Sequence, residues 1–368
     1  MNPSDDFLRD RVRSAPPAPP PAGSAAPPQP TRPLAHPPLP PPPSQPPVPP
    51  PHRWAFGDIQ PVTARPRRPR PARGWRRILS AATFGLVNLG PSVAERQEAA
   101  FVTTIRSVLR GSHKVGVLGK GGVGKTTVAA SVGSLFAQLR RNDRVVAVDA
   151  DTAFGRLGSR IDPHALSSYW DLATDQNLQS FADISGRVGA NAAGLHVLAG
   201  EPAAGRRRVL DPALFREAAL RLDRHFTISV IDCGSTMDAP VTQEALRDLD
   251  ALIVVSSPWA DGAAAAAKIM EWLADQGLTG LLSRTVVVLN DSDGHADKRT
   301  RSSLTEQFLR HGQAVVEVPF DPHLRPGGVI DVNDEMVPAV RLKFLQITAM
   351  IAYFFASRPH GRDGAQDN

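Results

Sequence analysis

The chain has 368 residues, which is room for one large or two small domains, and a formal net charge of +6. Seven arginines lie within Arg65–Arg77, so the rest of the chain is close to neutral and lacks the positive charge of a domain that binds DNA across a whole face. The single cysteine, Cys233, excludes a disulfide framework and a metal site built from several cysteines. The sequence contains no run of 18 or more apolar residues, so no membrane span is predicted. The N-terminus lacks the apolar core of a signal peptide, and we therefore expect a cytoplasmic protein.

Proline dominates the first part of the chain. Of its 36 prolines, 25 lie before residue 76, with pure runs at Pro40–Pro43 and Pro49–Pro51. Such a segment cannot bury enough apolar surface to fold, and it favours the extended polyproline II conformation. We expect residues 1–74 to form a disordered arm that is a ligand for a proline-reading module, a spacer, or a solvated linker with no specific partner.

A basic block, Arg65–Arg77 (RPRRPRPARGWRR), closes this arm. Three interpretations remain open: weak contact with an anionic membrane, weak contact with nucleic-acid phosphates, or a solvated linker. The following stretch, Ile78–Leu89, is apolar but too short to cross a bilayer, so we expect it to pack on the core or to lie at an interface.

The first predicted helix follows this arm. Ser92 and Glu95 have the spacing of a capping box, which predicts a helix that continues to about Arg110 and ends at Gly111. Residues 75–110 are therefore expected to form a linker and an N-terminal helix.

The strongest signal in the sequence is Lys114–Ala130 (KVGVLGKGGVGKTTVAA). The apolar run Val115–Leu118 predicts a buried strand, and the small residues of Thr127–Leu135 predict a helix. Between them, Gly119–Thr126 (GKGGVGKT) matches the P-loop pattern G-x-x-x-x-G-K-[ST]. The flanking strand and helix favour a phosphate-binding loop over an ordinary glycine-rich turn.

A P-loop assigns a role to each of its residues. Lys125 is expected to neutralise the β- and γ-phosphate oxygens, and the Thr126 hydroxyl to bind Mg²⁺. Backbone N–H groups and the start of the helix are expected to bind the phosphates. The other residues predicted to contact the nucleotide are Gly119, Gly121, Gly122, Val123, Gly124 and Thr127.

The remainder of the chain alternates strands and helices. Apolar runs predict strands at Arg144–Asp149, Leu195–Leu198, Phe226–Asp232, Ala251–Ser256, Thr285–Asn290 and Val316–Phe320. Helices are predicted at Pro212–His225, Ala260–Gln276 and Val337–Ser357, the last packed on the core. This alternation predicts an α/β fold with a doubly wound, mostly parallel sheet.

Acidic residues stand where two of these strands end. Asp149 and Asp151 close one strand, and the ligand crevice of a parallel sheet lies at the carboxyl ends of its strands. Asp232 closes another strand in the manner of a Walker B motif and is expected to hold Mg²⁺ through water. The alternative for Asp149 and Asp151 is a turn at the end of the strand that they cap. The alternative for Asp232 is an ordinary buried strand, since many of these end in an aspartate. Cys233, which follows, is expected to be a small buried residue.

The octapeptide Lys120–Thr127 (KGGVGKTT) resembles the deviant Walker A motif of the MinD/ParA family of P-loop ATPases. The resemblance implies that Lys120 reaches across a nucleotide-sandwich dimer to the partner's phosphates, while Lys125 acts within its own chain. It also implies that Asp149 lies near the Mg²⁺ shell and that Asp151 orients the attacking water.

The same resemblance implies a site for adenine, framed by Asn290, Pro319 and Asp321. One departure concerns hydrolysis: Gly155–Leu157 (GRL) stands where the family often has an asparagine. This departure puts the family's usual hydrolysis-coupling contacts in question.

Several further strings resemble one subgroup, the EspI-like ATPases found with actinobacterial type VII (ESX) secretion systems. The strings lie between about residues 75 and 355 and are Trp75–Arg77, Asn88–Ser92, Arg110–Ser112, Asp232–Gly234, Val254–Pro258, Val318–Leu324 and Gly327–Gly328. Many members of that subgroup lack the second aspartate of the Asp-x-Asp motif. This chain has Asp151, which favours retained hydrolysis.

The sequence therefore predicts a MinD/ParA-like ATPase domain at residues 111–357 and a disordered tail at residues 358–368. We expect an ATP- and Mg²⁺-dependent homodimer that regulates or positions a secretion machine through a protein partner, in the cytoplasm or peripherally at the inner face of the membrane. Two alternatives stay open: a DNA-partitioning ParA-type ATPase that binds non-specific DNA, and a non-hydrolysing scaffold that acts through its proline-rich arm.

Overall fold

The computed structural model describes residues 91–151, 155–165, 168–200 and 210–357, all within the unit Pro66–Asn368. The predicted arm at residues 1–74, the basic block, the apolar stretch Ile78–Leu89 and the tail at residues 358–368 lie outside the described residues.

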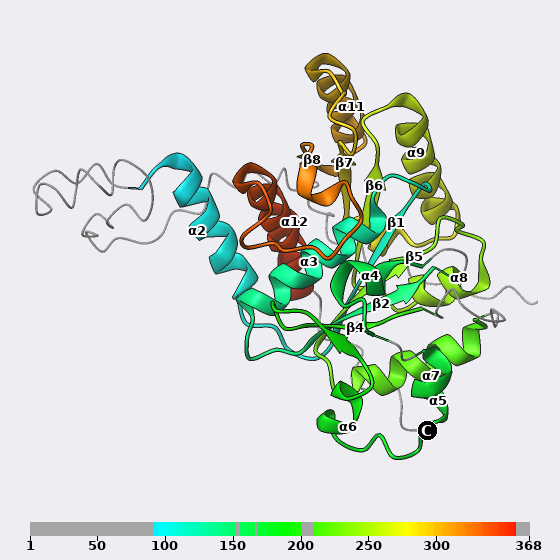
Figure 1. Cartoon of the computed structure of the whole chain (residues 1–368). Coiled ribbons are helices and arrows are strands. Elements are labelled where there is room, and N and C mark those ends of the chain that lie inside the picture. The colour runs from blue at the N-terminus through cyan, green and yellow to red at the C-terminus, as the bar shows by residue number, and fades with distance from the viewer. Residues whose placement is uncertain (1–90, 152–154, 166–167, 201–209, 358–368) are drawn as a thin grey trace, which may run out of the picture. The chain divides into compact units, whose positions relative to one another are not determined.

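Eight strands form one sheet at the centre of the fold (Figure 1). They are β1 (His113–Gly119), β2 (Val145–Ala150), β3 (Gly189–Ala190), β4 (Leu195–Leu198), β5 (Ile228–Cys233), β6 (Ala251–Ser256), β7 (Thr285–Asn290) and β8 (Ala314–Val318). Their order is β3-β4-β2-β5-β1-β6-β7-β8, and only β3 and β4 pair antiparallel. The strands from β1 to β7, apart from the short β3 and one position of β4, are buried along their whole length, as continuous apolar runs require in a sheet covered on both faces. The predicted doubly wound, mostly parallel sheet is confirmed.

Helices cover both faces of this sheet (Figure 1). One core includes residues of α3 (Lys125–Leu139), α4 (Leu157–Ile161) and α12 (Pro338–Ala356), with α2 (Val93–Ile105) packed on α12. The other includes residues of α5 (Tyr169–Thr174), α6 (Phe181–Ser185), α7 (Pro212–Asp223), α8 (Pro240–Leu246), α9 (Ala260–Asp275), α10 (Thr279–Leu282) and α11 (Lys298–Arg310). A 3₁₀ turn, η1 (Pro322–Leu324), precedes α12.

The capping box that begins α2 is confirmed, but the helix ends earlier than predicted. The Ser92 side chain accepts from the Glu95 N–H, and Glu95 Oε2 accepts from the Ser92 N–H at 2.6 Å. The helix ends at Ile105, not near Arg110. The reason is a long-range contact: the Arg140 guanidinium donates to the backbone carbonyls of Ile105 and Ser107, and thereby satisfies the end of the helix from another element.

The last helix, α12, is long and apolar enough to cross a membrane by length and composition alone. Its sequence contains no uninterrupted apolar run of about 18 residues, which is why the sequence predicts no membrane span there. In the structure, 61% of its most apolar 18-residue stretch is buried inside the fold. The prediction that it packs on the core is confirmed, since residues such as Phe344 and Ile347 are fully buried.

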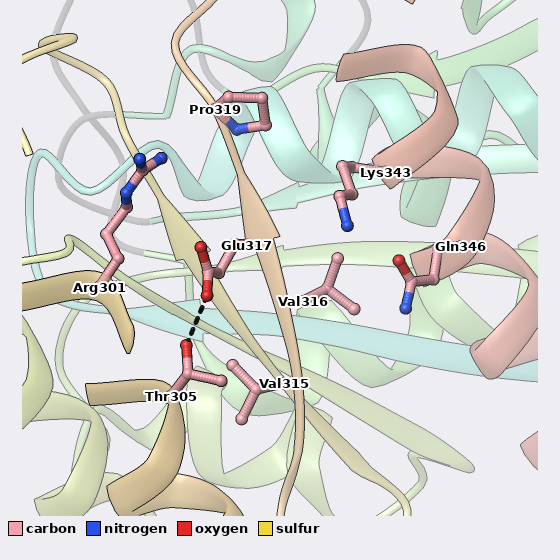
Figure 2. Close-up of a pocket in the computed structure, with 8 residues that line it drawn as sticks. All are labelled: Arg301, Thr305, Val315, Val316, Glu317, Pro319, Lys343 and Gln346. Atoms are coloured by element: carbon pink, nitrogen blue, oxygen red, sulfur yellow. Dashed lines mark hydrogen bonds between the residues drawn. The ribbon is translucent and has the colours of Figure 1, made fainter. Parts of the chain in front are cut away.

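The strand β8 lies at the open edge of the sheet, beside a pocket of about 340 Å³ (Figure 2). It ends at Val318, two residues before the predicted Phe320, because Pro319 has no N–H to continue the strand ladder. Arg301 of α11 and Lys343 of α12 line this pocket, and Glu317 accepts a hydrogen bond from the Thr305 hydroxyl at 2.8 Å. Charged side chains and a proline are the features with which natural proteins protect an edge strand from pairing with another chain.

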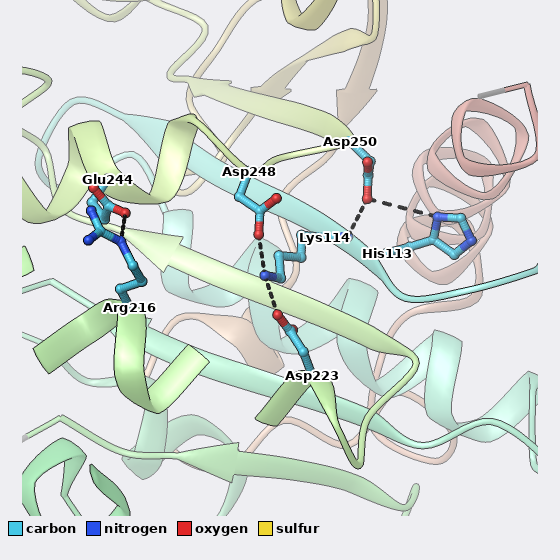
Figure 3. A network of polar contacts seen from close by, with 7 residues as sticks. All are labelled: His113, Lys114, Arg216, Asp223, Glu244, Asp248 and Asp250. Atoms are coloured by element: carbon cyan, nitrogen blue, oxygen red, sulfur yellow. Dashed lines mark hydrogen bonds and ion pairs between the residues drawn. The ribbon is translucent and has the colours of Figure 1, made fainter. Parts of the chain in front are cut away.

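A network of charged groups lies at the amino end of β1 (Figure 3). The Lys114 ammonium group pairs with Asp223 at 2.5 Å and with Asp248. Its backbone N–H donates to Asp250 at 2.9 Å, and its carbonyl accepts from the Asp250 N–H at 2.9 Å. Burial lowers the pKa of Lys114, but the Asp223 and Asp248 carboxylates outweigh burial and raise this pKa above its ordinary value. The network joins the starts of β1 and β6 to the end of α7.

Candidate nucleotide-binding site

The loop between β1 and α3 depends on glycine, since Gly119, Gly122 and Gly124 all have a positive φ. Gly124 has a φ of +95°, and a Cβ on it would lie 2.4 Å from Asn290 Nδ2. A Cβ on Gly119 would lie 2.2 Å from the carbonyl oxygen of Val255 on β6. The loop is therefore held tightly between β6 and β7, in the curled form that a P-loop needs.

Asn290 supports this loop from the end of β7. Its side chain is buried, and its Nδ2 donates to the carbonyl of Val123 at 2.8 Å. The sequence predicted Asn290 as an adenine contact. The structure shows a further role, since the same amide fixes the phosphate loop in place.

The two lysines of the loop lie in opposite surroundings. Lys125, the first residue of α3, is buried, and its Nζ lies 3.4 Å from the carbonyl oxygen of Lys120. The Lys120 side chain is 48% exposed and pairs at 2.6 Å with Asp261 in the first turn of α9. Lys125 can thus act on an anion inside the loop, whereas Lys120 is at the surface.

Two buried carboxylates face the start of α3 from neighbouring strands. Asp149 on β2 and Asp232 on β5 are paired in register. Asp149 accepts hydrogen bonds from the N–H groups of Asp151 at 3.2 Å and Leu157 at 3.0 Å. Both Asp232 oxygens are buried without a hydrogen-bond partner of normal geometry among the described residues. The two aspartates are therefore equally buried but unequally satisfied.

The electrostatics of these carboxylates suit a bound cation. Burial raises the pKa of Asp149 to about 6, although the backbone N–H groups that it accepts from lower it. Burial and the nearby Asp149 carboxylate raise the pKa of Asp232 to about 8, with Thr126 and Lys125 acting in the opposite direction. Grouped acids with raised pKa values are typical of functional sites, and these two lie beside the glycine loop.

A divalent cation such as Mg²⁺ fits the Asp232 oxygens and the Thr126 hydroxyl. Mg²⁺ takes oxygen ligands, keeps several waters and is usually shared between one or two carboxylates and substrate phosphates. Across the described ranges, no group of three or more histidine, cysteine, aspartate or glutamate side chains is arranged to hold a metal by itself. One carboxylate and one hydroxyl leave positions around such a cation for water and phosphate oxygens.

Asp151 lies just beyond β2, close to the same acids. A Cβ on Gly234 would lie 3.7 Å from Asp151 Oδ1, which places this carboxylate beside the segment that follows β5. Gly155 has a structural role, since a Cβ there would lie 2.5 Å from both Asp149 oxygens. The departure at Gly155–Leu157 thus has a local explanation: Gly155 leaves room for Asp149, and the Leu157 N–H binds it.

The segment after β8 contains the other two predicted adenine contacts. Asp321 is buried, and its carboxylate accepts from the N–H groups of His323 at 2.9 Å and Val337 at 2.8 Å. It thereby fixes the entry into α12. Pro319 lines the pocket at the edge of β8, together with Lys343 (Figure 2).

One buried residue near the site was not predicted. Arg160 of α4 donates to the Thr127 hydroxyl at 2.8 Å. Its only sequence signal is an arginine inside the short, otherwise uncharged helix LGSRI, which does not distinguish it from a surface residue.

Comparison with known proteins identifies the fold family. The model described as "CobQ/CobB/MinD/ParA nucleotide binding domain" matches residues 116–326, which include the P-loop and all three aspartates. The chain belongs to this family. The resemblance inferred from the P-loop of this MinD/ParA domain is thereby confirmed.

Two curated relatives carry the name "ESX-1 secretion-associated protein EspI" and come from two strains of Mycobacterium tuberculosis. Each is 32% identical over 284 residues, which is 76% of this chain and 42% of the relative. The chain thus spans about two fifths of the length of these relatives. The resemblance to EspI-like proteins is confirmed at the level of homology.

Solved structures of similar arrangement include the cell division ATPase MinD of Pyrococcus furiosus, with 21% identity and a TM-score of 0.49. The alignment covers 67% of this chain and 98% of that one. A ParA family ATPase from Chlorobium tepidum has 17% identity and a TM-score of 0.48, with coverage of 67% and 98%.

Proposed function

We propose that this chain binds and hydrolyses ATP with Mg²⁺ and that ATP binding closes two copies into a face-to-face dimer. The observation that carries the proposal is the meeting of three elements at one edge of the sheet: a curled glycine loop, the buried Lys125, and the under-satisfied carboxylate of Asp232. The two buried charges cost stability in the protein alone, and both become favourable once a phosphate and a cation are bound beside the loop.

The residues divide the work of phosphoryl transfer. Lys125 and the loop N–H groups neutralise the β- and γ-phosphates. Thr126 and Asp232 hold Mg²⁺, with Asp149 near its water shell, and the cation withdraws charge from the phosphate oxygens. Asp151 orients the attacking water from its position past β2.

Dimerisation assigns a function to the surface lysine. Lys120 is exposed at the mouth of the loop, so it is available to contact the phosphates of a second copy. The positive charges of Lys120 and Lys125 would then meet the transferring phosphoryl group from two sides. Asn290, Pro319 and Asp321 belong to the two segments that frame adenine in this proposal, and residues 111–357 form the ATPase domain.

The cellular role proposed here follows from the relatives. Homology to proteins named as ESX-1 secretion-associated supports a role in regulating or positioning a type VII secretion machine through a protein partner, in the cytoplasm or at the inner face of the membrane. The arm and its basic block, Arg65–Arg77, are the segment available for a further protein, lipid or nucleic-acid contact.

Light scattering of the purified chain with Mg²⁺, with and without ATP, tests the switch. We expect the wild-type mass to double with ATP, and Asp151→Ala to remain dimeric for longer because it cannot position water. Phosphate release, measured in parallel, should be lost in Asp151→Ala. Lys125→Ala is the matched control and should stay monomeric in both conditions.

Different results would support the alternatives. If ATP left the molecular mass unchanged in both wild type and Asp151→Ala, the ATP-dependent dimer would be overturned. The non-hydrolysing scaffold would then be favoured. ATP-dependent binding of random-sequence DNA that weakens steeply with salt would favour a partition ATPase.

A further inference from the structure

Arg160 is a buried cation whose charge no carboxylate balances within the described ranges. Its relative exposure is 5%, and burial lowers its pKa. Its guanidinium donates to three neutral acceptors: the Thr127 hydroxyl at 2.8 Å and the carbonyls of Leu324 at 2.8 Å and Gly328 at 2.9 Å. A buried charge held only by neutral groups is costly and calls for a functional reason.

These three acceptors belong to two distant parts of the chain. Thr127 lies in the first turn of α3, directly after Thr126, the residue proposed above to bind Mg²⁺. Leu324 and Gly328 lie between β8 and α12, 164 and 168 residues from Arg160 in sequence. The backbone of Arg160 contributes as well, since its carbonyl accepts from the Ile330 N–H at 2.9 Å. Arg160 thus ties the phosphate helix to the segment that follows Asp321.

The hydrogen bond from Arg160 determines what the Thr127 hydroxyl can do. A threonine hydroxyl has one donor hydrogen and two acceptor positions. Because Arg160 donates to the oxygen, the hydroxyl hydrogen remains available to donate to an anion. Thr127 is at the helix N-terminus, where backbone N–H groups also favour negative charge.

We propose that Arg160 is a positioning residue that couples phosphate binding at Thr127 to base recognition by residues 319–328. The inference rests on the proposed nucleotide-binding function and assigns the regulation of that same site. A bound phosphate supplies, through the Thr127 hydroxyl, the negative charge that the guanidinium lacks. The same guanidinium then holds the segment on the base side in the binding conformation.

The test compares the binding of ATP, GTP and inorganic tripolyphosphate by calorimetry, each with Mg²⁺, to the full chain. For Arg160→Met we expect ATP affinity to fall about tenfold more than tripolyphosphate affinity, because the segment that contacts the base loses its support. We also expect the ratio of ATP affinity to GTP affinity to decrease. Arg160→Lys keeps the charge but cannot reach three acceptors at once, so an intermediate loss is expected.

The matched control is Arg140→Met. Arg140 is a similarly buried arginine at the other end of α3, with a relative exposure of 9%. It binds the carbonyls of Ile105 and Ser107 and, unlike Arg160, also pairs with a carboxylate, that of Asp143 at 2.6 Å. Its loss should lower stability without changing the ratio between the three ligands. If Arg160→Met lost the same affinity for all three ligands, the proposed coupling would be overturned, whatever the result for Arg140→Met.

A double-mutant cycle keeps the test decisive if Arg160→Met does not fold. Thr127→Val removes the acceptor with little change of shape. If Arg160 acts through Thr127, the losses of ATP affinity in Arg160→Lys and Thr127→Val will be less than additive, and strict additivity would contradict the proposal. Failure of the proposed function looks different: wild type and Lys125→Ala would then bind ATP equally weakly.

Discussion

Two lysines near opposite ends of β1 are similarly buried, but their charges are satisfied differently. Lys114 at the amino end has a relative exposure of 7%, and Lys125, just past the carboxyl end, has 8%. Lys114 lies between the carboxylates of Asp223 and Asp248 (Figure 3). The ammonium group of Lys125 lies near a loop carbonyl at 3.4 Å, and the carboxylate of Asp232 nearby has no hydrogen-bond partner of normal geometry among the described residues.

This contrast separates structural charge from functional charge. At the amino end, the positive and negative groups complete one another and join three elements. At the carboxyl end, Lys125 and the Asp232 carboxylate suit the phosphate and the cation of the proposed function. Under that proposal, incompletely satisfied buried charge marks the site, whereas burial alone does not.

The largest expected effect is that mutation of one lysine lowers stability, whereas mutation of the other lowers ATP affinity. Lys114→Met should lower the free energy of unfolding by about 1–3 kcal/mol. It leaves the partly buried Asp223 carboxylate without its partner, whereas the Asp248 side chain is 60% exposed and its pairing contributes little. Lys125→Met should lower ATP affinity about 100-fold or more, because a charged contact to phosphate is lost, and should leave stability near wild type. Chemical denaturation and calorimetric titration with Mg-ATP measure the two quantities.

Each variant serves as the control for the other. Lys114→Met protein that remains folded should bind ATP with near-normal affinity, since its network lies at the opposite edge of the sheet. If Lys125→Met were the less stable variant, or if both lysines affected ATP binding equally, the distinction between the two ends would fail.

The sequence predicted the sheet well because its strands are buried on both faces. The bounds of β4, β6 and β7 coincide with the apolar runs Leu195–Leu198, Ala251–Ser256 and Thr285–Asn290. The helix α11 (KRTRSSLTEQFLR) was not predicted, since it lies at the edge and buries only Leu304 and Phe308. A weak apolar stripe on a polar helix gives little periodic signal.

The site was predictable where its chemistry is local and not where it depends on long-range contacts. The P-loop and the strand-ending aspartates follow from short patterns. The contact of Asn290 with Val123 spans 167 residues, and that of Arg160 with Gly328 spans 168. No local pattern specifies which distant carbonyl a side chain will meet, so these supports emerge only from the fold.

Asp232→Asn tests whether the carboxylate at the end of β5 lowers the stability of the metal-free protein while serving nucleotide binding. In the folded protein the pKa of Asp232 is about 8, which is above the ordinary value of an aspartate. The contribution of Asp232 to stability is therefore fully present at pH values below the ordinary aspartate pKa and is lost as the pH rises through 8. We expect Asp232→Asn to stabilise the metal-free protein by about 1–2 kcal/mol at pH 8 and by less at pH 5, and to remove the Mg²⁺ dependence of nucleotide binding. Thermal denaturation at both pH values measures the first effect, and destabilisation at pH 8 would contradict it.

The raised pKa values also predict how nucleotide binding varies with pH. Mg²⁺ requires ionised carboxylates, while Asp149 with a pKa of about 6 and Asp232 with a pKa of about 8 keep their protons in the metal-free protein below those values. Mg-ATP affinity should therefore rise between pH 6 and pH 8.5, with release of roughly one proton at neutral pH. Calorimetry in two buffers of different ionisation enthalpy counts the protons. Asp232→Asn should flatten the profile, and a flat wild-type profile would contradict the assignment.

A smaller effect is expected from the glycines. Gly124→Ala should cost about 1–2 kcal/mol of stability because of its positive φ, and the clash with Asn290 should weaken ATP binding further. Gly111→Ala is the matched control: its φ is +80°, but nothing lies within 4 Å of a Cβ there. It should lose stability alone. Equal ATP affinity in the two variants would show that the contact with Asn290 does not shape the loop.

The smallest effect on stability is expected at Lys120, whose side chain and that of Asp261 are 48% and 64% exposed. Exposed ion pairs contribute little because water and salt screen them, so Lys120→Ala should leave the denaturation midpoint unchanged. The same variant should abolish the ATP-dependent dimer while still binding ATP, if the exposed lysine acts on a second copy. Light scattering and calorimetry on one preparation separate the two properties. A Lys120→Ala protein that dimerises normally with ATP would confine this lysine to its pair with Asp261, and the carboxyl end of the sheet would then act within a single chain.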